Sequence, residues 1–153
     1  MAEERVQRRL AAILAADVVG YSRLMGVDEE GTLARMKKLR ADVIDPKIAE
    51  YSGRIFKTTG DGILAEFPSA VDAVRQAVDV QRAMAKLNKD TPENTRIAFR
   101  IGISLGDVMV DGDDLFGNGV NVAARMEGLA EPGGICVSGN VQEHIGRSLV
   151  VGI

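Results

Sequence analysis

The sequence contains one cysteine and one histidine, Cys136 and His144, in 153 residues. A disulfide needs two cysteines, and a structural zinc site takes about four ligands drawn mostly from these two residue types. A disulfide framework and such a zinc site are therefore both excluded. Because Cys136 lies between Ile135 and Val137, we interpret it as a buried structural thiol.

Long hydrophobic runs are also absent. The longest purely apolar run is Leu10–Ala16, far below the roughly 20 residues that cross a bilayer. It leads into Asp17 rather than into a small-residue cleavage site, so it does not have the pattern of a secretory signal. We therefore expect no membrane segment in this chain and a cytoplasmic location.

A strong charge of either sign is missing as well. The 19 Lys and Arg residues nearly balance the 22 Asp and Glu residues, and a net charge of −3 gives no electrostatic basis for binding nucleic acid or an anionic membrane. The 46% hydrophobic and 27% charged content is ordinary for a globular protein, and 153 residues suit one domain. With no internal repeat or linker, we expect a tail over residues 1–8, one domain over residues 9–153, and small-molecule partners.

Hydrophobic periodicity predicts alternating strands and helices after this tail. Ala11–Val19 is nearly all apolar, which suits a strand covered on both faces, and Asp28–Tyr51 has the apolar spacing of a long helix, capped by Asp28 and bent at Pro46. The later elements, in order, are strands at 54–59 and 63–67, a helix after Pro68, strands at 97–105 and 108–110, a helix at 118–129 and a strand at 134–138. This order predicts a mixed sheet with helices on one face, in an α+β fold with a ferredoxin-like βαββαβ core and an additional helix and strand.

Two aspartates are candidates for metal binding. Asp17 ends an apolar strand, where an unpaired charge is costly unless a cation compensates it. Asp61 lies in the Gly60-Asp61-Gly62 turn between two predicted strands. Each has a purely structural alternative, since Asp17 could accept backbone hydrogen bonds in a turn and Asp-Gly is itself a hairpin former. The βαββ order can bring both carboxylates to one sheet edge, where oxygen ligands suit Mg²⁺ or Mn²⁺ together with phosphate.

A polar pair projects from the otherwise apolar helix predicted at 118–129. Asn121 and Arg125 are four residues apart and so lie on one face of that helix. Structural alternatives exist here too: Asn118 could cap the helix, and Arg125 could form a solvated ion pair with Glu127 or Asp113. Lys57 could likewise be an ordinary solvated lysine of a strand.

Three segments together resemble the catalytic domain of the class III nucleotidyl cyclases. They are Ala15–Ser22, Phe56–Gly62 and Gly117–Arg125, and the resemblance extends from about Arg9 to Ser148. It implies that two divalent cations, Mg²⁺ or Mn²⁺, are held by Asp17, Asp61 and the backbone carbonyl of Val18. It also implies that Asn121 orients the ribose, that Arg125 stabilises charge on the α-phosphate, and that Lys57 and Asp114 recognise adenine.

The same resemblance implies an adenylate cyclase that converts ATP to cyclic AMP and pyrophosphate. Lys57 donates to adenine N1 and Asp114 accepts from the exocyclic amine, whereas guanine would leave both groups unpaired. Asp113, next to Asp114, leaves a one-residue ambiguity. The resemblance also implies a head-to-tail homodimer, in which one subunit supplies Asp17 and Asp61 and the other supplies Lys57, Asp114, Asn121 and Arg125.

The chain departs from the family in stopping at Ile153, before a terminal β-hairpin that carries a triphosphate-contacting lysine. We therefore expect a fragment of a longer protein, with regulatory domains missing and with weak activity or none. A non-catalytic nucleotide-binding or dimerisation module and a guanylate cyclase are alternatives. A diguanylate cyclase or a polymerase-like palm fits less well, because such domains lack the helix motif of Asn121 and Arg125.

Overall fold

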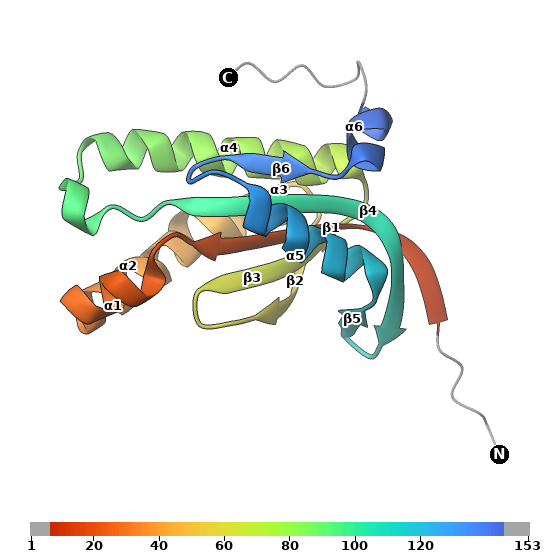
Figure 1. The fold of residues 1–153 in the computed structure, drawn as a ribbon, viewed down its shortest axis with the longest axis horizontal. Helices are drawn as coiled ribbons and strands as arrows, with labels where there is room; N and C mark the ends of the chain where they lie inside the picture. The colour runs from red at the N-terminus through yellow and green to blue at the C-terminus, as the bar shows by residue number, and fades with distance from the viewer. Residues whose placement is uncertain (1–6, 146–153) are drawn as a thin grey trace.

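A computed structural model describes residues 7–145 of the chain as one curved, six-stranded sheet flanked by helices (Figure 1). The strand order is β2-β3-β1-β4-β5, with β6 also pairing with β4. Neighbouring strands are antiparallel except for β4 and β6, which are parallel, so the expected mixed sheet and ferredoxin-like α+β core are confirmed. In chain order the strands are β1 (Gln7–Val18), β2 (Arg54–Thr58), β3 (Gly62–Phe67), β4 (Phe99–Asp111), β5 (Asp114–Phe116) and β6 (Ile135–Val137).

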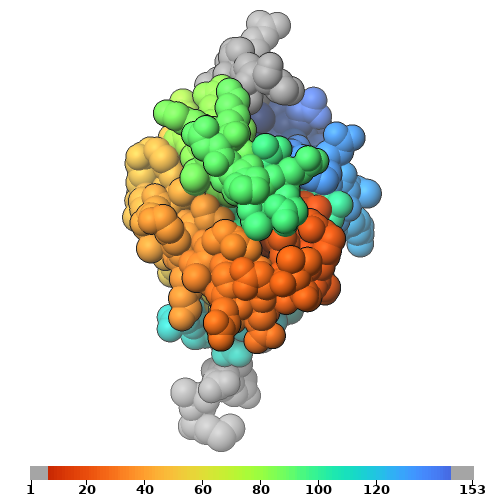
Figure 2. All heavy atoms as spheres, turned by 90° about the vertical axis from the view of Figure 1, so that its left-hand side faces the viewer, coloured from red at the N-terminus to blue at the C-terminus, as the bar shows by residue number. Residues whose placement is uncertain are grey.

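Helices connect these strands. Figure 2 looks onto the end of the molecule where the orange α1 and α2 lie beside the green C-terminal end of α4. Within residues 7–145, no helix combines the length and apolar character needed to cross a membrane. In chain order the helices are α1 (Tyr21–Val27), α2 (Glu29–Leu39), a π-helical turn (Arg40–Ile44), α3 (Asp45–Glu50), α4 (Ala70–Lys89), a 3₁₀ turn (Glu93–Thr95), α5 (Asn118–Leu129) and α6 (Gly139–Ile145).

Helices cover both faces of the sheet, so the expectation that they pack on one face is wrong. Successive β1 side chains point to opposite faces. Ala12 and Leu14 join the core beneath α4, whereas Ala11 and Ile13 pack with Ala123 of α5 on the other face. Figure 1 shows α5 in front of β1 and β4 while α4 runs along another side. The first strand is therefore buried on both faces, as its apolar sequence predicts.

The sheet is longer than the sequence indicates. The predicted tail is wrong for Gln7 and Arg8, which pair with Val110 and Met109 of β4, and residues 1–6 lie outside the described residues. The separate strands predicted at 97–105 and 108–110 are the single strand β4. Gly106, at the expected break, instead stays in register opposite Ala11.

The helix predicted over Asp28–Tyr51 is interrupted. The Asp28 cap is confirmed, because its carboxylate accepts a hydrogen bond from the Gly31 amide at 3.0 Å. The π-helical turn then separates α2 from α3, and Pro46 lies in the first turn of α3. Proline has no amide hydrogen to donate and clashes with the preceding turn, so the helical hydrogen-bond pattern changes just before it. Helix α1 was not predicted, because the residue that precedes its first turn is Gly20, which has no side chain to cap the helix.

Helix α5 packs directly against the backbone of β4 at Gly102. A Cβ atom at Gly102 would lie 2.0 Å from the Glu127 amide nitrogen and 2.4 Å from the Ala123 carbonyl oxygen. Both neighbours are backbone atoms, so no side chain could rotate away to make room. Gly102 therefore sets how closely α5 approaches the sheet.

We expect Gly102→Ala to destabilise the protein by about 1–3 kcal/mol, because α5 must move away from β4. Chemical denaturation monitored by circular dichroism measures this change. Gly128→Ala is the matched control, since a Cβ at this α5 position meets no atom within 4 Å. Equal stabilities for the two variants would show that the close approach of α5 to β4 does not require glycine at position 102.

Candidate active site

The chain segments that carry Asp17 and Asp61 are adjacent in space. Asp17 ends β1 opposite Gly62 of β3, and the Val18 amide donates a hydrogen bond to the Asp61 carbonyl oxygen at 2.9 Å. The turn between β2 and β3 is closed by a 2.8 Å hydrogen bond from the Thr59 amide to the Gly62 carbonyl. The predicted convergence of the two aspartates at one sheet edge therefore agrees with the fold.

The donor set at this edge suits a hard divalent cation. Oδ1 of Asp17 is buried and has no hydrogen-bond partner within residues 7–145. A buried carboxylate oxygen without a partner is costly, and a cation would satisfy it. The described residues contain no group of three Cys, His, Asp or Glu side chains placed to hold a metal. Two aspartates would therefore leave most of the coordination shell to backbone carbonyls, water and phosphate oxygens, as is usual for Mg²⁺.

Glu127 of α5 is a third carboxylate at this edge, and sequence reasoning missed it. Burial, followed by a hydrogen bond to Asp17 and the negative charges of Asp17 and Asp61, raises the pKa of the Glu127 carboxyl to about 8, although Arg100 opposes the shift. Arg100 lies opposite Asp17 in the β1–β4 pairing, and its buried Nε has no partner in the described part of the chain. In the sequence, Glu127 was considered only as a possible ion-pair partner of Arg125.

We expect Glu127 to make the metal-free protein less stable as the pH rises. The folded-state pKa lies above the usual value of 4.5, so the folded protein keeps a proton that the unfolded chain loses. The stabilisation is complete below about pH 4.5 and is lost as the pH rises through about 8. When thermal unfolding is measured in a chelator across this pH range, the unfolding midpoint should change less with pH for Glu127→Gln than for the wild type. Identical profiles would contradict the prediction.

Lys57 and Asp114, the predicted base-recognition residues, meet within one chain. The Lys57 ammonium lies 3.5 Å from Oδ2 of Asp114 and 5.1 Å from the centre of the Phe116 ring. Oδ1 of Asp114 accepts a 2.8 Å hydrogen bond from the Leu115 amide. A bulge between Ile55 and Lys57 shifts the β2–β3 register next to this pair, and such bulges commonly reorient side chains beside functional sites. β5, which carries Asp114, was too short to be predicted.

An arginine network holds the turn before Asp114. Arg54 donates to Oε1 of Glu66 from Nε and Nη2 at 3.0 and 2.8 Å, and from Nη1 to the Asp113 carbonyl at 2.8 Å. Arg9 bonds the other oxygen of Glu66 at 2.7 Å. Burial alone would raise the pKa of Glu66, but the hydrogen bonds and positive charges of Arg9 and Arg54 together outweigh it and lower the pKa below its usual value. The network uses only the backbone carbonyl of Asp113, whereas the Asp114 carboxylate lies against Lys57, which favours Asp114 as the partner of Lys57 in the site.

Asn121 and Arg125 extend from α5 into solvent. Both are exposed, and neither side chain makes a hydrogen bond or ion pair with another described residue. The cap position of α5 is Gly117, without a side-chain cap bond, so the alternative roles for Asn118 and Arg125 are not observed. Within residues 7–145, no hydrogen bond or ion pair joins this pair, or the Lys57–Asp114 pair, to Asp17 and Asp61. The candidate residues thus form separate groups on one chain.

Comparisons with known proteins agree on one family. The family model of the adenylate and guanylate cyclase catalytic domain matches residues 5–149. A protein of Rhizobium meliloti (strain 1021), provisionally named adenylate cyclase 3, is 53% identical over 145 residues, which cover 95% of this chain and 25% of that protein. An adenylate cyclase of Streptomyces coelicolor is 32% identical over 146 residues, or 95% of this chain and 36% of that protein. The chain therefore spans about a quarter to a third of these curated relatives.

The fold comparison gives the same result. The crystal structure of an adenylate/guanylate cyclase/hydrolase from Silicibacter pomeroyi has a TM-score of 0.89 and 50% sequence identity to this chain. The match covers 95% of this chain and 84% of that one. At this similarity the order and packing of the elements are shared along nearly the whole chain.

Proposed function

This chain belongs to the adenylate and guanylate cyclase catalytic domain family, and from that membership we propose that it converts ATP to cyclic AMP and pyrophosphate. The observation that carries the proposal is the juxtaposition of Asp17 and Asp61 at one sheet edge, with a buried Asp17 oxygen that lacks a partner. Such an edge suits a polyphosphate substrate that arrives with divalent cations.

In the proposed mechanism the side chains bind and orient the nucleotide. Asp17, Asp61 and the Val18 carbonyl would hold two divalent cations, and these would supply Lewis-acid stabilisation of the phosphate oxygens and of the ribose 3′ oxygen. Asn121 orients the ribose so that its 3′ oxygen lies in line with the α-phosphorus and the leaving pyrophosphate. Arg125 donates hydrogen bonds to the α-phosphate oxygens, where negative charge develops in the transition state.

Base choice rests on Lys57 and Asp114. Adenine presents an acceptor at N1 and a donor at its exocyclic amine, which match the lysine ammonium and the aspartate carboxylate. Guanine presents the opposite pattern and would leave both groups unpaired, at about 1–3 kcal/mol each. The 3.5 Å contact between Lys57 and Asp114 supports this assignment, since two base-reading residues must lie close enough to reach one ring.

We further propose that each site is shared between two copies of the chain. Asn121 and Arg125 are exposed, and no ion pair or hydrogen bond within residues 7–145 joins them to the aspartates. A two-fold related copy could bring its Asn121 and Arg125 to the aspartates of this one, which would create two equivalent sites. A non-catalytic dimerisation module could use the same surface, and the assay below separates these possibilities.

The test incubates the protein with ATP or GTP and either Mg²⁺ or Mn²⁺, and measures cyclic nucleotide and pyrophosphate together. Cyclic AMP formed with equimolar pyrophosphate, and little cyclic GMP, is the expected result. Predominant cyclic GMP would reverse the base assignment. Nucleotide binding without either product, in a protein shown to be dimeric, would favour the non-catalytic module.

A further inference from the structure

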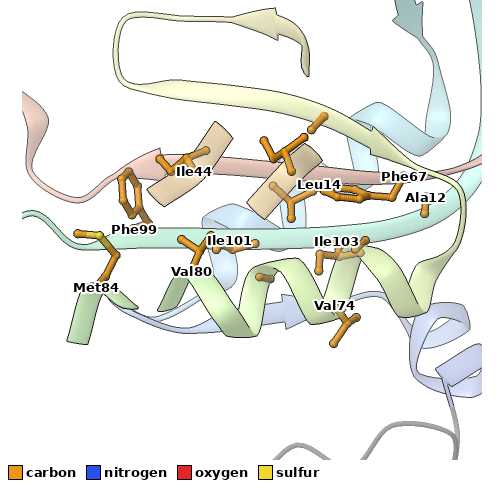
Figure 3. Close-up of a cluster of buried hydrophobic side chains, with 14 of the residues drawn as sticks. Ala12, Leu14, Ile44, Phe67, Val74, Val80, Met84, Phe99, Ile101 and Ile103 are labelled. Carbon is orange, nitrogen blue, oxygen red and sulfur yellow. The ribbon is translucent and has the colours of Figure 1, made fainter. Parts of the chain in front are cut away.

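A cavity of about 370 Å³ lies between the sheet and the helices on the α4 face. Its walls include the buried side chains of Leu14, Val80, Phe99 and Ile101, which Figure 3 shows in the layer between the sheet and α4. Sites for small ligands typically measure about 300–1,000 Å³ and are mostly apolar with a few placed polar groups. The cavity has the size and the apolar character of such a site.

One buried polar side chain lines this cavity without a partner. Gln76 of α4 is only 2% exposed, and its Oε1 has no hydrogen-bond partner among the described residues. Gln81, five residues further along α4, also has a buried Oε1 without a partner in the described chain, but its Nε2 bonds the Phe99 and Gly134 carbonyls at 2.9 and 3.0 Å and it does not line the cavity. Because buried amides are normally satisfied, the unpaired Gln76 points to a missing hydrogen-bond donor.

The cavity is distinct from the edge that carries Asp17. In β1 the lining residues Leu14 and Ala16 point to the α4 face, whereas Asp17, between Ala16 and Val18, points to the α5 face with Ala15. The walls are mostly apolar, which favours an uncharged molecule over a triphosphate. The charged residues of the lining are Lys37, Arg40, Asp45 and Asp61, and of these Arg40 and Asp45 pair with each other at 2.8 Å.

The turn that carries Asp61 forms part of the same cavity wall. Residues 59–63, which include Gly60, Asp61 and Gly62, line it together with Met36 and Ile44. A molecule in the cavity would therefore pack against the turn from the side away from Asp17. It would hold the turn in the conformation in which the Asp61 carbonyl accepts from the Val18 amide.

We propose that this cavity binds a small, uncharged, mostly apolar molecule that donates one hydrogen bond to the Gln76 amide oxygen. Occupancy stabilises the Asp61 turn, so ligand binding and divalent-cation binding strengthen each other. The coupling to divalent-cation binding rests on the proposed function, whereas the binding of the apolar molecule concerns the cavity alone.

Indole is a suitable probe, because it carries one N–H donor on an apolar ring and the chain has no tryptophan to obscure its fluorescence. We expect saturable binding of indole, about tenfold tighter than of 1-methylindole, which lacks the donor. Gln76→Leu should abolish this preference while preserving the fold and the thermal midpoint. Gln142→Leu, the same change at an exposed residue of α6, should retain it.

Equal affinity of wild type for both probes, or an unchanged preference in Gln76→Leu, would overturn the proposal. If Gln76→Leu fails to fold, Gln76→Met replaces it, because an unbranched apolar side chain of similar length lacks the acceptor and should also lose the preference. Mn²⁺ titrations with and without indole test the coupling, and equal Mn²⁺ affinities would refute it. These readouts are binding constants, so a failure of cyclase activity would count against the proposed function and leave the cavity result standing.

Discussion

Arg125→Ala is expected to lower kcat by about two to three orders of magnitude, with little change in thermal stability. The arginine is exposed and makes no hydrogen bond or ion pair in the described chain that its loss would break, so its removal should affect only the transition state. Cyclic AMP formation under saturating ATP and Mn²⁺ measures the loss. Arg75→Ala, at an exposed arginine of α4, is the matched control and should retain full activity.

Mixing two inactive variants tests directly whether each site is shared between two subunits. Asp17→Ala should be inactive alone, because the cation site loses its buried ligand. When equal amounts of Asp17→Ala and Arg125→Ala exchange subunits, about half of the dimers are mixed, and each mixed dimer has one intact site and one doubly damaged site. About a quarter of wild-type activity should return. No recovery, with subunit exchange demonstrated by labelled chains, would refute a site built from two copies.

Asp114→Ala is expected to lower kcat/KM for ATP by about 10- to 100-fold and to change the value for GTP far less. The carboxylate accepts from the adenine amine in the proposed complex, and guanine has no donor there. Steady-state kinetics with both nucleotides measure the change in discrimination. Asp113→Ala is the matched control, since the adjacent carboxylate is exposed and only its backbone carbonyl is used by Arg54.

The controls decide between the neighbouring aspartates. If Asp113→Ala loses ATP selectivity and Asp114→Ala keeps it, the base reader is one residue earlier than proposed. Lys57→Ala should resemble Asp114→Ala, because both groups contact the same ring. A uniform loss for ATP and GTP in Asp114→Ala would instead indicate a structural role for the Lys57–Asp114 ion pair.

The sequence predicted the elements whose pattern is local. The apolar run before Asp17, the Gly60-Asp61-Gly62 turn and the helix at Asn118–Leu129 all carry signals within a few residues, and the structure has them at the expected places. The fold class and family follow from their order. The roles of Asp17, Asp61, Asn121 and Arg125 stay predictions until the variants are measured.

The features that were missed depend on tertiary contacts. The burial of both sheet faces arises because Gly102 and Gly106 let α5 approach β4, and no periodicity in α5 reveals which face it covers. Glu127 reaches Asp17 only through that same close packing. β5 has three residues, too few for an alternating pattern to be recognised.

The ion pair between Lys57 and Asp114 makes base selection an exchange rather than a simple addition. In the nucleotide-free chain each group already has the other as its partner, and with side-chain exposures of 41% and 33% that pairing is weak. Adenine can replace it with two matched hydrogen bonds at little cost. Guanine would have to separate the pair without supplying a matching acceptor and donor. The ion pair of the nucleotide-free chain therefore disfavours guanine.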